Sequence, residues 1–381
     1  MQFDDLLKLM VQKRGSDLFI CPDVPPSLKV NGIVVPITKT ALSAEMTRDV
    51  VLGVMNEQQR KEFARTKECN FAITAPHIGR FRVSAYHQRN IMSMVLRRIE
   101  THIPRVDELR LPPVVKELVM AKRGIVLVVG ATGTGKSTSL AAMVGHRNQY
   151  SRGHIITIED PIEFLHRPEG CIVSQREVGF DTESFEVALK NTLRQAPDVI
   201  LIGEIRSREV MDYAIAFAET GHLVLATLHA NNANQALDRI RHFFPADRQQ
   251  QICMDLALNL RGIVAQQLIP TPDGKARRPC VEVLLNSPLA AEHIRKGEIK
   301  ELKELMKKSR EIGMQTFDQA LYALYAAGDI TYDDALCYAD APNDLRLAIK
   351  LGIDSDLGQI ERATRGLSLQ PAPPPAERRP V

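Results

Sequence analysis

The chain has 381 residues, and its 44% apolar and 25% charged content is typical of a globular protein with two domains and additional segments. Lysine and arginine number 49 against 46 aspartate and glutamate residues, and this near balance argues against a dedicated nucleic-acid-binding protein. Six scattered cysteines without a CxxC pair argue against a zinc module or a disulfide scaffold. The lack of a long apolar run or a basic signal peptide leads us to expect a reducing, cytoplasmic compartment.

Residues 1–101 have the pattern of a small α+β domain. Residues 1–14 have apolar side chains at helical spacing, and short strands are expected at 18–20, 28–30, 33–35, 80–86 and 92–99. Asn31-Gly32, between two of these runs, is a hairpin signal. Residues 102–113 contain three prolines and are predicted to form a linker.

Residues 114–286 change to strands that alternate with helices. Continuous apolar runs are present at 125–129, 155–158, 199–202 and 223–226. Such runs are typical of strands buried on both faces of a parallel sheet. The predicted fold class is therefore α/β, with ligands bound at the carboxyl ends of the strands. Residues 287–366 are predicted to be helical, and the proline-rich residues 367–381 to be disordered.

A phosphate-binding motif follows the first apolar run. Residues 130–137 fit G-x-x-x-x-G-K-[ST], with a strand before them and a helix expected to begin near Thr138. Such glycines let backbone N–H groups surround phosphates, Lys136 should reach the β and γ phosphates, and Ser137 should ligate Mg²⁺. The predicted cofactors are ATP and Mg²⁺, and the predicted binding residues are Gly130, Ala131, Thr132, Gly133, Thr134, Gly135, Lys136, Ser137 and Thr138.

Hydrolysis requires further groups, and acidic residues follow two of the predicted strands. Glu159, Asp160 and Glu163 lie at the end of the second strand, where Pro161 should fix a turn. A solvated acidic turn is the alternative, but a position at a strand's carboxyl end favours function. Glu204 ends a Walker-B-like strand in which glycine replaces the usual aspartate, so we expect it to hold Mg²⁺ through water.

Two histidines and two arginines are further candidates. His222 and His229 bracket the fourth strand, and spacing alone leaves structural and γ-phosphate-sensing roles open. Arg82 and Arg97 lie on candidate strands of the first domain. They are either surface arginines of a half-buried sheet or groups that close over an ATP held by the second domain.

Taken together, GATGTGKSTSLAAM, ITIEDPIEF, VILIGEIR and TGHLVLATLHANNA resemble, in order, the motifs of the secretion-type AAA-like ATPases of type II secretion and type IV pili. The resemblance extends from Gly15 to Leu351. It implies a PAS-like amino-terminal domain joined flexibly to a RecA-like core, and a ring of six subunits. It also implies site roles: a catalytic carboxylate at Glu163, a Mg²⁺-linked acid at Glu204, γ-phosphate sensors at His222 and His229, and the family's arginines at Arg82 and Arg97.

Within this family the chain is similar to the retraction ATPases of the PilT and PilU group, because it shows no large amino-terminal domain and no tetracysteine module. SDLFI, SLKVNGIVVPITK, GMQTFDQALYALYAAGDI and NDLRLAIKL resemble the PilU type more than the PilT type. Phe19 replaces a usual histidine, Ser207 replaces a usual aspartate, and no AIR-type helix motif is recognisable near Arg295. These departures favour an accessory motor over one that retracts pili alone.

The resemblance implies a homo-hexameric ATPase that powers pilus retraction and twitching motility. Its implied partners are an inner-membrane pilus platform protein and a paralogous retraction ATPase, with no nucleic acid. It would lie in the cytoplasm at the inner face of the inner membrane, associated with it only through proteins. A pilus assembly or type II secretion ATPase, a non-hydrolysing nucleotide-gated scaffold and a RecA-type nucleic-acid motor are the alternatives.

Overall fold

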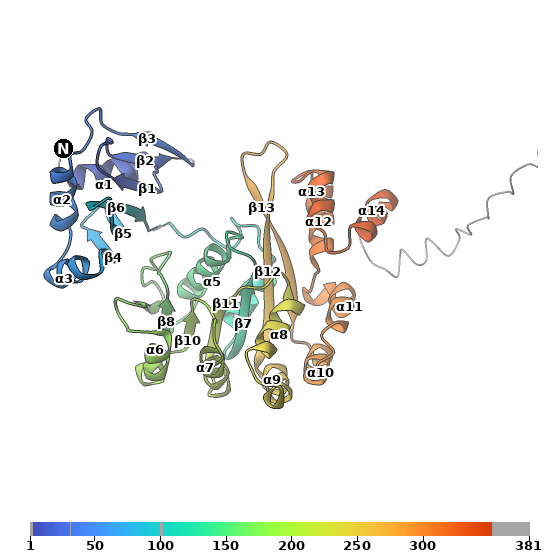
Figure 1. Ribbon diagram of the computed structural model, residues 1–381. Helices are drawn as coiled ribbons and strands as arrows, with labels where there is room; N and C mark the ends of the chain where they lie inside the picture. The colour runs from blue at the N-terminus through green and yellow to red at the C-terminus, as the bar shows by residue number, and fades with distance from the viewer. Residues whose placement is uncertain (1–2, 31, 100–101, 353–381) are drawn as a thin grey trace, which may run out of the picture. The chain divides into compact units, whose positions relative to one another are not determined.

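The computed structural model describes residues 3–30, 32–99 and 102–352, and its elements are labelled in Figure 1. The chain forms two compact units. The first contains residues up to 103 together with 161–167 and 175–183, and the second contains the other residues. In the part of the chain that the structure describes, every helix is too short or too polar to cross a bilayer.

The first unit is an antiparallel sheet packed against helices. Its elements are α1 (Phe3–Gln12), β1 (Asp17–Ile20), β2 (Ser27–Val30), β3 (Ile33–Pro36), α2 (Ala44–Gly53), α3 (Glu57–Thr66), β4 (Glu68–Ala75), β5 (Gly79–Gln88) and β6 (Ile91–Arg98). The strand order is β3-β2-β1-β6-β5-β4. Helix α1 buries Leu6, Leu7 and Met10, the face that helical spacing predicts. All the strands expected in this region are present, and Asn31 of the hairpin signal lies outside the described residues.

The second unit is built on a seven-stranded sheet with the order β13-β12-β7-β11-β10-β8-β9. The strands of this sheet are β7 (Gly124–Val129), β8 (Gly153–Glu159), β9 (Cys171–Glu177), β10 (Val199–Ile202), β11 (Leu223–Leu228), β12 (Leu260–Pro270) and β13 (Arg277–Leu285), and the last three residues of β9 are assigned to the first unit. Its helices are α4 (Val114–Met120), α5 (Lys136–Tyr150), α6 (Phe185–Thr192), α7 (Arg208–Glu219), α8 (Ala233–His242), α9 (Ala246–Asn259), α10 (Pro288–Lys296), α11 (Glu301–Lys308), α12 (Phe317–Ala326), α13 (Tyr332–Cys337) and α14 (Pro342–Leu351).

The central strands of this sheet confirm the prediction from continuous apolar runs. Strands β12, β7, β11, β10 and β8 are joined by parallel pairings, and every residue of β7, β10 and β11 is buried. Because the strands are parallel, their carboxyl ends meet at one edge of the sheet. The P-loop follows β7 at this edge. The fold is α/β, with a RecA-like core, a smaller α+β amino-terminal part and a helical carboxyl-terminal region.

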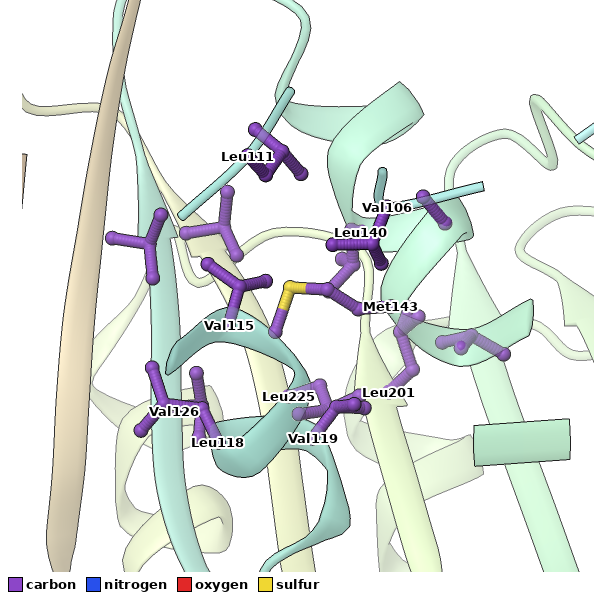
Figure 2. Close-up of a cluster of buried hydrophobic side chains, with 14 of the residues drawn as sticks. Val106, Leu111, Val115, Leu118, Val119, Val126, Leu140, Met143, Leu201 and Leu225 are labelled. Carbon is purple, nitrogen blue, oxygen red and sulfur yellow. The ribbon is translucent and has the colours of Figure 1, made fainter. Parts of the chain in front are cut away.

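A hydrophobic cluster fixes α4 and α5 onto the sheet (Figure 2). Met143 of α5 packs among residues of α4, β7, β10 and β11 in this cluster. Val106 and Leu111 of the predicted linker are also buried in it. The segment before α4 therefore contributes to the core of the second unit, because burial in this cluster removes these two apolar side chains from water.

Two of the helices after β13, α12 and α13, begin where local sequence signals predict. Thr316 caps α12 in a capping box with Gln319, and the Thr331 side chain accepts from the Asp334 N–H at the start of α13. The helical region expected after Ser287 is present as far as the described residues extend. The predicted proline-rich tail at 367–381 lies outside them.

Glu282, on β13, is a buried carboxylate that joins the start of α8 to the sheet. Its side chain is 1% exposed and accepts from the Ala233 N–H at the start of α8, at 2.9 Å. Burial raises its pKa to about 7, Asp340 acts in the same direction, and hydrogen bonds and Lys303 oppose the shift. Between about pH 4.5 and pH 7, the folded chain therefore keeps a proton on Glu282 that the unfolded chain has already lost.

We expect Glu282 to lower the free energy of unfolding by about 3 kcal/mol as pH rises from about 4.5 to about 7, whereas His166, whose pKa burial lowers to about 4, acts in the opposite direction over the same range. Glu282→Gln should therefore make the slope of unfolding free energy against pH more positive by this amount, because glutamine does not titrate. Urea denaturation of both proteins at several pH values in this window measures the effect. Glu292→Gln is the control. Glu292 is an exposed carboxylate that pairs with Lys296, so its replacement should leave the slope unchanged. An unaltered slope in Glu282→Gln would contradict the assignment.

Candidate active site

Two glycines of the P-loop, Gly130 and Gly135, allow the loop to pack closely against its neighbours. A Cβ on Gly130 would lie 2.5 Å from Thr134 Oγ1 and 2.6 Å from the Gln266 carbonyl oxygen. Gly135 has a φ of +87°, and its Cβ would lie 2.8 Å from Gln266 Nε2. The loop therefore lies directly against β12, and α5 begins at its end with its N–H groups directed at the loop.

Lys136 is the first residue of α5 and is half-buried. Its Nζ donates to the carbonyl oxygens of Gly130 and Ala131, at 2.8 Å each. Burial lowers the pKa of Lys136, and the negative charge of Glu204 acts in the opposite direction. The ammonium group thus lies across the loop, held by neutral carbonyl oxygens that phosphate oxygens could replace.

Acidic and basic side chains meet at the ends of the neighbouring strands. Glu204, two residues after β10, accepts from Arg206 Nε at 2.7 Å, and its Oε1 lies 3.1 Å from His229 Nε2. Arg206 also reaches Asp160, beyond β8, at 3.5 Å. The structure therefore brings Lys136, Glu204 and His229 together at the P-loop edge of the sheet.

Gly203 explains the departure from the usual Walker B sequence. A Cβ at this position would lie 3.1 Å from Glu159 Cα and 3.2 Å from the Ile158 carbonyl oxygen. A side chain here would therefore require the backbone at the end of β8 to shift by a few tenths of an ångström. Glycine avoids this crowding at the position where an aspartate is usual.

His222 lies apart from this group. It precedes β11, and Leu223 pairs with Gly124 at the amino end of β7, whereas the P-loop follows the carboxyl end. Six residues of strand separate the two ends, roughly 20 Å. Its Nδ1 lies 3.1 Å from both Thr220 Oγ1 and the Phe217 carbonyl oxygen, within its own turn. This position does not support a γ-phosphate sensor for the P-loop of the same subunit.

Arg82 and Arg97 are direct neighbours across the first unit's sheet. They are paired in the antiparallel register of β5 and β6, so their side chains share one face. Arg82 Nη2 lies 3.9 Å from Glu163 Oε1. Arg97 Nε donates to Asp17 Oδ1 at 2.9 Å. Asp17 lies on β1, directly opposite Arg97 in the antiparallel pairing of β1 with β6. Each arginine therefore lies close to a carboxylate of the first unit, and neither is an isolated surface side chain.

The three acids after β8 are divided between the two units. Glu159 and Asp160 belong to the second unit, whereas Glu163 belongs to the first. Gln175 holds the segment 161–167, because it accepts from the His166 N–H at 2.8 Å and donates to the Phe164 carbonyl at 2.9 Å. The Glu163 carboxylate is therefore attached to the unit that contains Arg82.

Glu177 is a second residue that holds this segment, and sequence patterns did not identify it. Its buried carboxylate accepts weakly from the Ile162 N–H at 3.4 Å and lies 4.0 Å from Arg80. Burial raises the pKa of Glu177, while the Ile162 N–H and the charges of Arg82 and Arg80 lower it. Two acids, Glu163 and Glu177, thus face the arginines of β5.

Gln266 is the other residue that sequence patterns missed. It is 3% exposed in the middle of β12, donates from Nε2 to the Thr134 carbonyl at 2.8 Å and accepts from Ser139 Oγ at 2.7 Å. It therefore ties the P-loop to α5. The available signal was the polar pair Gln266-Gln267, with apolar residues on both sides of it.

Gln266→Leu should weaken nucleotide binding about tenfold, because the loop carbonyl and the Ser139 hydroxyl lose their buried partner. Equilibrium binding of a fluorescent ATP analogue measures this loss. Gln315→Leu is a matched control, since Gln315 makes a similar 2.7 Å bond to the Val281 carbonyl away from the P-loop. Equal losses in the two variants would show a general folding defect.

The oxygen ligands at this edge suit Mg²⁺. Among the described residues there is no group of three or more His, Cys, Asp or Glu side chains that could hold a metal. Mg²⁺ needs only one or two protein ligands when phosphates complete its shell. The Ser137 hydroxyl, next to Lys136, and the Glu204 carboxylate are ligands of the required hard type.

Comparisons with known proteins agree with this geometry. Residues 4–324 match the family described as Type II/IV secretion system protein. The chain is 70% identical over 370 residues to the Type IV pilus ATPase PilU of Pseudomonas aeruginosa, covering 97% of each chain. It is 36% identical to the Type IV pilus retractation ATPase PilT of the same organism, covering 90% of this chain and 100% of PilT. The crystal structure of the pilus retraction motor PilT with bound ADP has a TM-score of 0.85 at 36% identity, covering 91% and 99% of the two chains.

Proposed function

Because the chain belongs to the type II/IV secretion system protein family, in its PilU and PilT group of pilus ATPases, we propose that it is an ATP-hydrolysing hexameric motor for type IV pilus retraction. The observation on which this rests is the P-loop with Lys136, Glu204 and His229 at one edge of the sheet. That edge is where α/β sheets bind their ligands.

The second unit supplies the nucleotide-binding groups in this proposal. The backbone N–H groups of residues 130–138 hold the phosphates, and Lys136 exchanges its loop carbonyls for phosphate oxygens. Ser137 would hold Mg²⁺ directly, and Glu204 through water. When bound, Mg²⁺ supplies positive charge against the phosphates. His229, in contact with Glu204, can sense the γ phosphate.

The first unit supplies the groups for hydrolysis. We propose that Glu163 orients and deprotonates the attacking water, and that Arg82 and Arg97 stabilise negative charge on the phosphates. Arg82 lies opposite Arg97 in the register of β5 and β6, and its guanidinium lies 3.9 Å from the Glu163 carboxylate. This grouping of the three charges supports the assignment. Movement of one unit relative to the other would then convert hydrolysis into mechanical work.

The proposed organisation is a PAS-like domain at 1–101, a linker at 102–113, an ATPase core at 114–286 and a helical region from 287. We propose the cytoplasm, at the inner face of the inner membrane, as the location. An inner-membrane platform protein and a PilT-type paralogue are the proposed partners. The similarity to PilU favours an accessory role beside such a paralogue.

Deletion of the gene tests the direction of the motor. A retraction motor predicts cells that keep or gain surface pili but lose part or all of their twitching motility, by electron microscopy and by a stab assay. Cells without pili would support an assembly ATPase instead. The control is complementation with the wild-type chain, which should restore motility.

A further inference from the structure

The buried carboxylate of Glu282 joins two helices of the second unit at their first residues. Its Oε1 accepts from the Ala233 N–H, at the start of α8, at 2.9 Å. The Phe317 N–H, at the start of α12, also hydrogen-bonds to this carboxylate. All three residues belong to the second unit. The roles proposed above for hydrolysis do not use this side chain.

The start of α8 continues directly from the segment that carries His229. Residues 229–232 are the whole connection between β11 and α8. His229 is the first of these four residues, and its Nε2 lies 3.1 Å from Glu204 Oε1. Asn231, in the same connection, lines a pocket together with P-loop residues 131–134. A connection this short holds His229 in one place only when both of its ends are fixed.

The two ends of this connection are fixed in different ways. Its first end continues from the central strand β11, every residue of which is buried. At its other end, the Asn232 side chain accepts from the Gln235 N–H at 2.9 Å, and Gln235 Oε1 accepts from the Asn231 N–H at 3.1 Å. These two bonds lie within the connection and α8. The bond to Glu282 is the one that fixes this end to strand β13.

Burial makes this bond hard to replace. Ala233 is 0% exposed and Glu282 is 1% exposed, so water does not reach either partner. A buried N–H that loses its acceptor is costly, and a shift of the helix start toward other acceptors relieves that cost. Above the Glu282 pKa of about 7 the carboxylate is ionised, and its hydrogen bonds are then charge-assisted.

We propose that Glu282 is a positioning residue for His229: by holding the first residue of α8, it keeps the histidine against Glu204 at the P-loop edge. The inference rests on the role toward the γ phosphate proposed above for His229. Glu282 acts through the histidine rather than on the nucleotide. Because Phe317 donates to the same carboxylate, the start of α12 belongs to this support as well.

Steady-state phosphate release at pH 8 and calorimetric binding of ADP, both on the full chain, test the proposal. Glu282→Met keeps the side-chain volume but removes the acceptor, and it should lower kcat about tenfold by displacing His229. ADP affinity should stay within about twofold, because ADP has no γ phosphate and the P-loop is unchanged. Glu282→Gln keeps one acceptor oxygen and should recover part of the lost kcat.

Ala233→Pro removes the same hydrogen bond from the other side. Proline lacks the N–H and suits the first position of a helix, and the extended backbone of Asn232, with a φ of −150° and a ψ of 177°, is compatible with a following proline. This variant should lower kcat by a factor similar to that of Glu282→Met. The two changes together should cost little more than either alone, because they remove one bond.

Asp318→Asn is the matched control. Asp318, on α12, is 4% exposed and accepts from the Asp340 and Ala341 N–H groups at 2.8 and 3.1 Å, just before α14. It is thus another buried carboxylate that holds backbone near a helix start, but the helix is α14 rather than α8. Its replacement should leave kcat and ADP affinity unchanged.

A double-mutant cycle with His229→Ala separates positioning from a general folding defect. If Glu282 acts through His229, Glu282→Met should lower the kcat of His229→Ala by less than about twofold. A tenfold loss in both backgrounds would overturn the inference. So would full activity of Ala233→Pro, or an equal loss of kcat in Asp318→Asn. Ala233→Pro and Glu282→Gln carry the same cycle if thermal denaturation shows that Glu282→Met is unstable.

This inference and the proposed function can fail separately. If the wild-type chain releases no phosphate, alone or beside a PilT-type paralogue, the proposed function itself fails. If His229→Ala is as active as the wild type, the proposed role of His229 fails. If His229→Ala is impaired but its loss adds fully to that of Glu282→Met, only the positioning role of Glu282 fails.

Discussion

Lys136→Ala is expected to reduce phosphate release from MgATP by about a thousandfold, because it removes a positive charge aimed at the phosphates. The half-buried ammonium already lies across the P-loop, bonded to the Gly130 and Ala131 carbonyls. Removing it leaves those oxygens and a bound triphosphate without a nearby cation. Nucleotide affinity should fall as well, which distinguishes this variant from one that affects only chemistry.

The measurement is steady-state phosphate release by the purified chain, alone and with a PilT-type paralogue. Lys116→Ala is the matched control: this lysine lies on α4 in the same unit and pairs at the surface with Asp107 at 2.6 Å. Exposed pairs of this kind contribute little, so activity should be unchanged. Normal phosphate release by Lys136→Ala would refute the assignment of the P-loop.

The sequence predicted those parts of the site that depend on local pattern. The P-loop between β7 and α5 was predictable because its glycines, Lys136 and the flanking apolar strand are consecutive. The four core strands were predictable for the same reason, since each is one continuous apolar run. Family resemblance then supplied roles that pattern alone left open, including those of Arg82 and Arg97.

Parts of the site that depend on contacts distant in sequence were not predictable. Gln266 lies 132 residues from Thr134, and only the pairing of β12 with β7 brings them together. The β12–β13 hairpin itself was missed because its residues mix apolar and polar types. The same limit applies to His222, whose spacing from His229 did not reveal that they lie at opposite ends of β11.

The division of the acids after β8 was also hidden from the sequence. ITIEDPIEF reads as one motif, yet Asp160 belongs to the second unit and Glu163 to the first. The reason is tertiary, because Gln175 and Glu177 bind the backbone around Glu163. A consequence is that the proposed base and the proposed P-loop are carried by different units.

Glu163→Gln should reduce phosphate release at least about a hundredfold while leaving ATP affinity within about twofold, because glutamine keeps the shape but cannot accept the proton. Glu183→Gln is the matched control, since Glu183 is an exposed acid in the same unit. It should retain full activity. A variant at Glu163 as active as the wild type would assign the base elsewhere.

The coupling between Glu163 and Arg82 separates a hydrolase from a nucleotide-gated scaffold. If both act on one transition state, as their 3.9 Å separation suggests, Arg82→Ala in the Glu163→Gln background should cost less than in the wild type. Additive losses would mean that the two side chains act independently. If the wild-type chain binds ATP but releases no phosphate, even beside a PilT-type paralogue, then nucleotide occupancy alone is its signal. Glu163 would in that case serve to pair with Arg82 rather than to activate water.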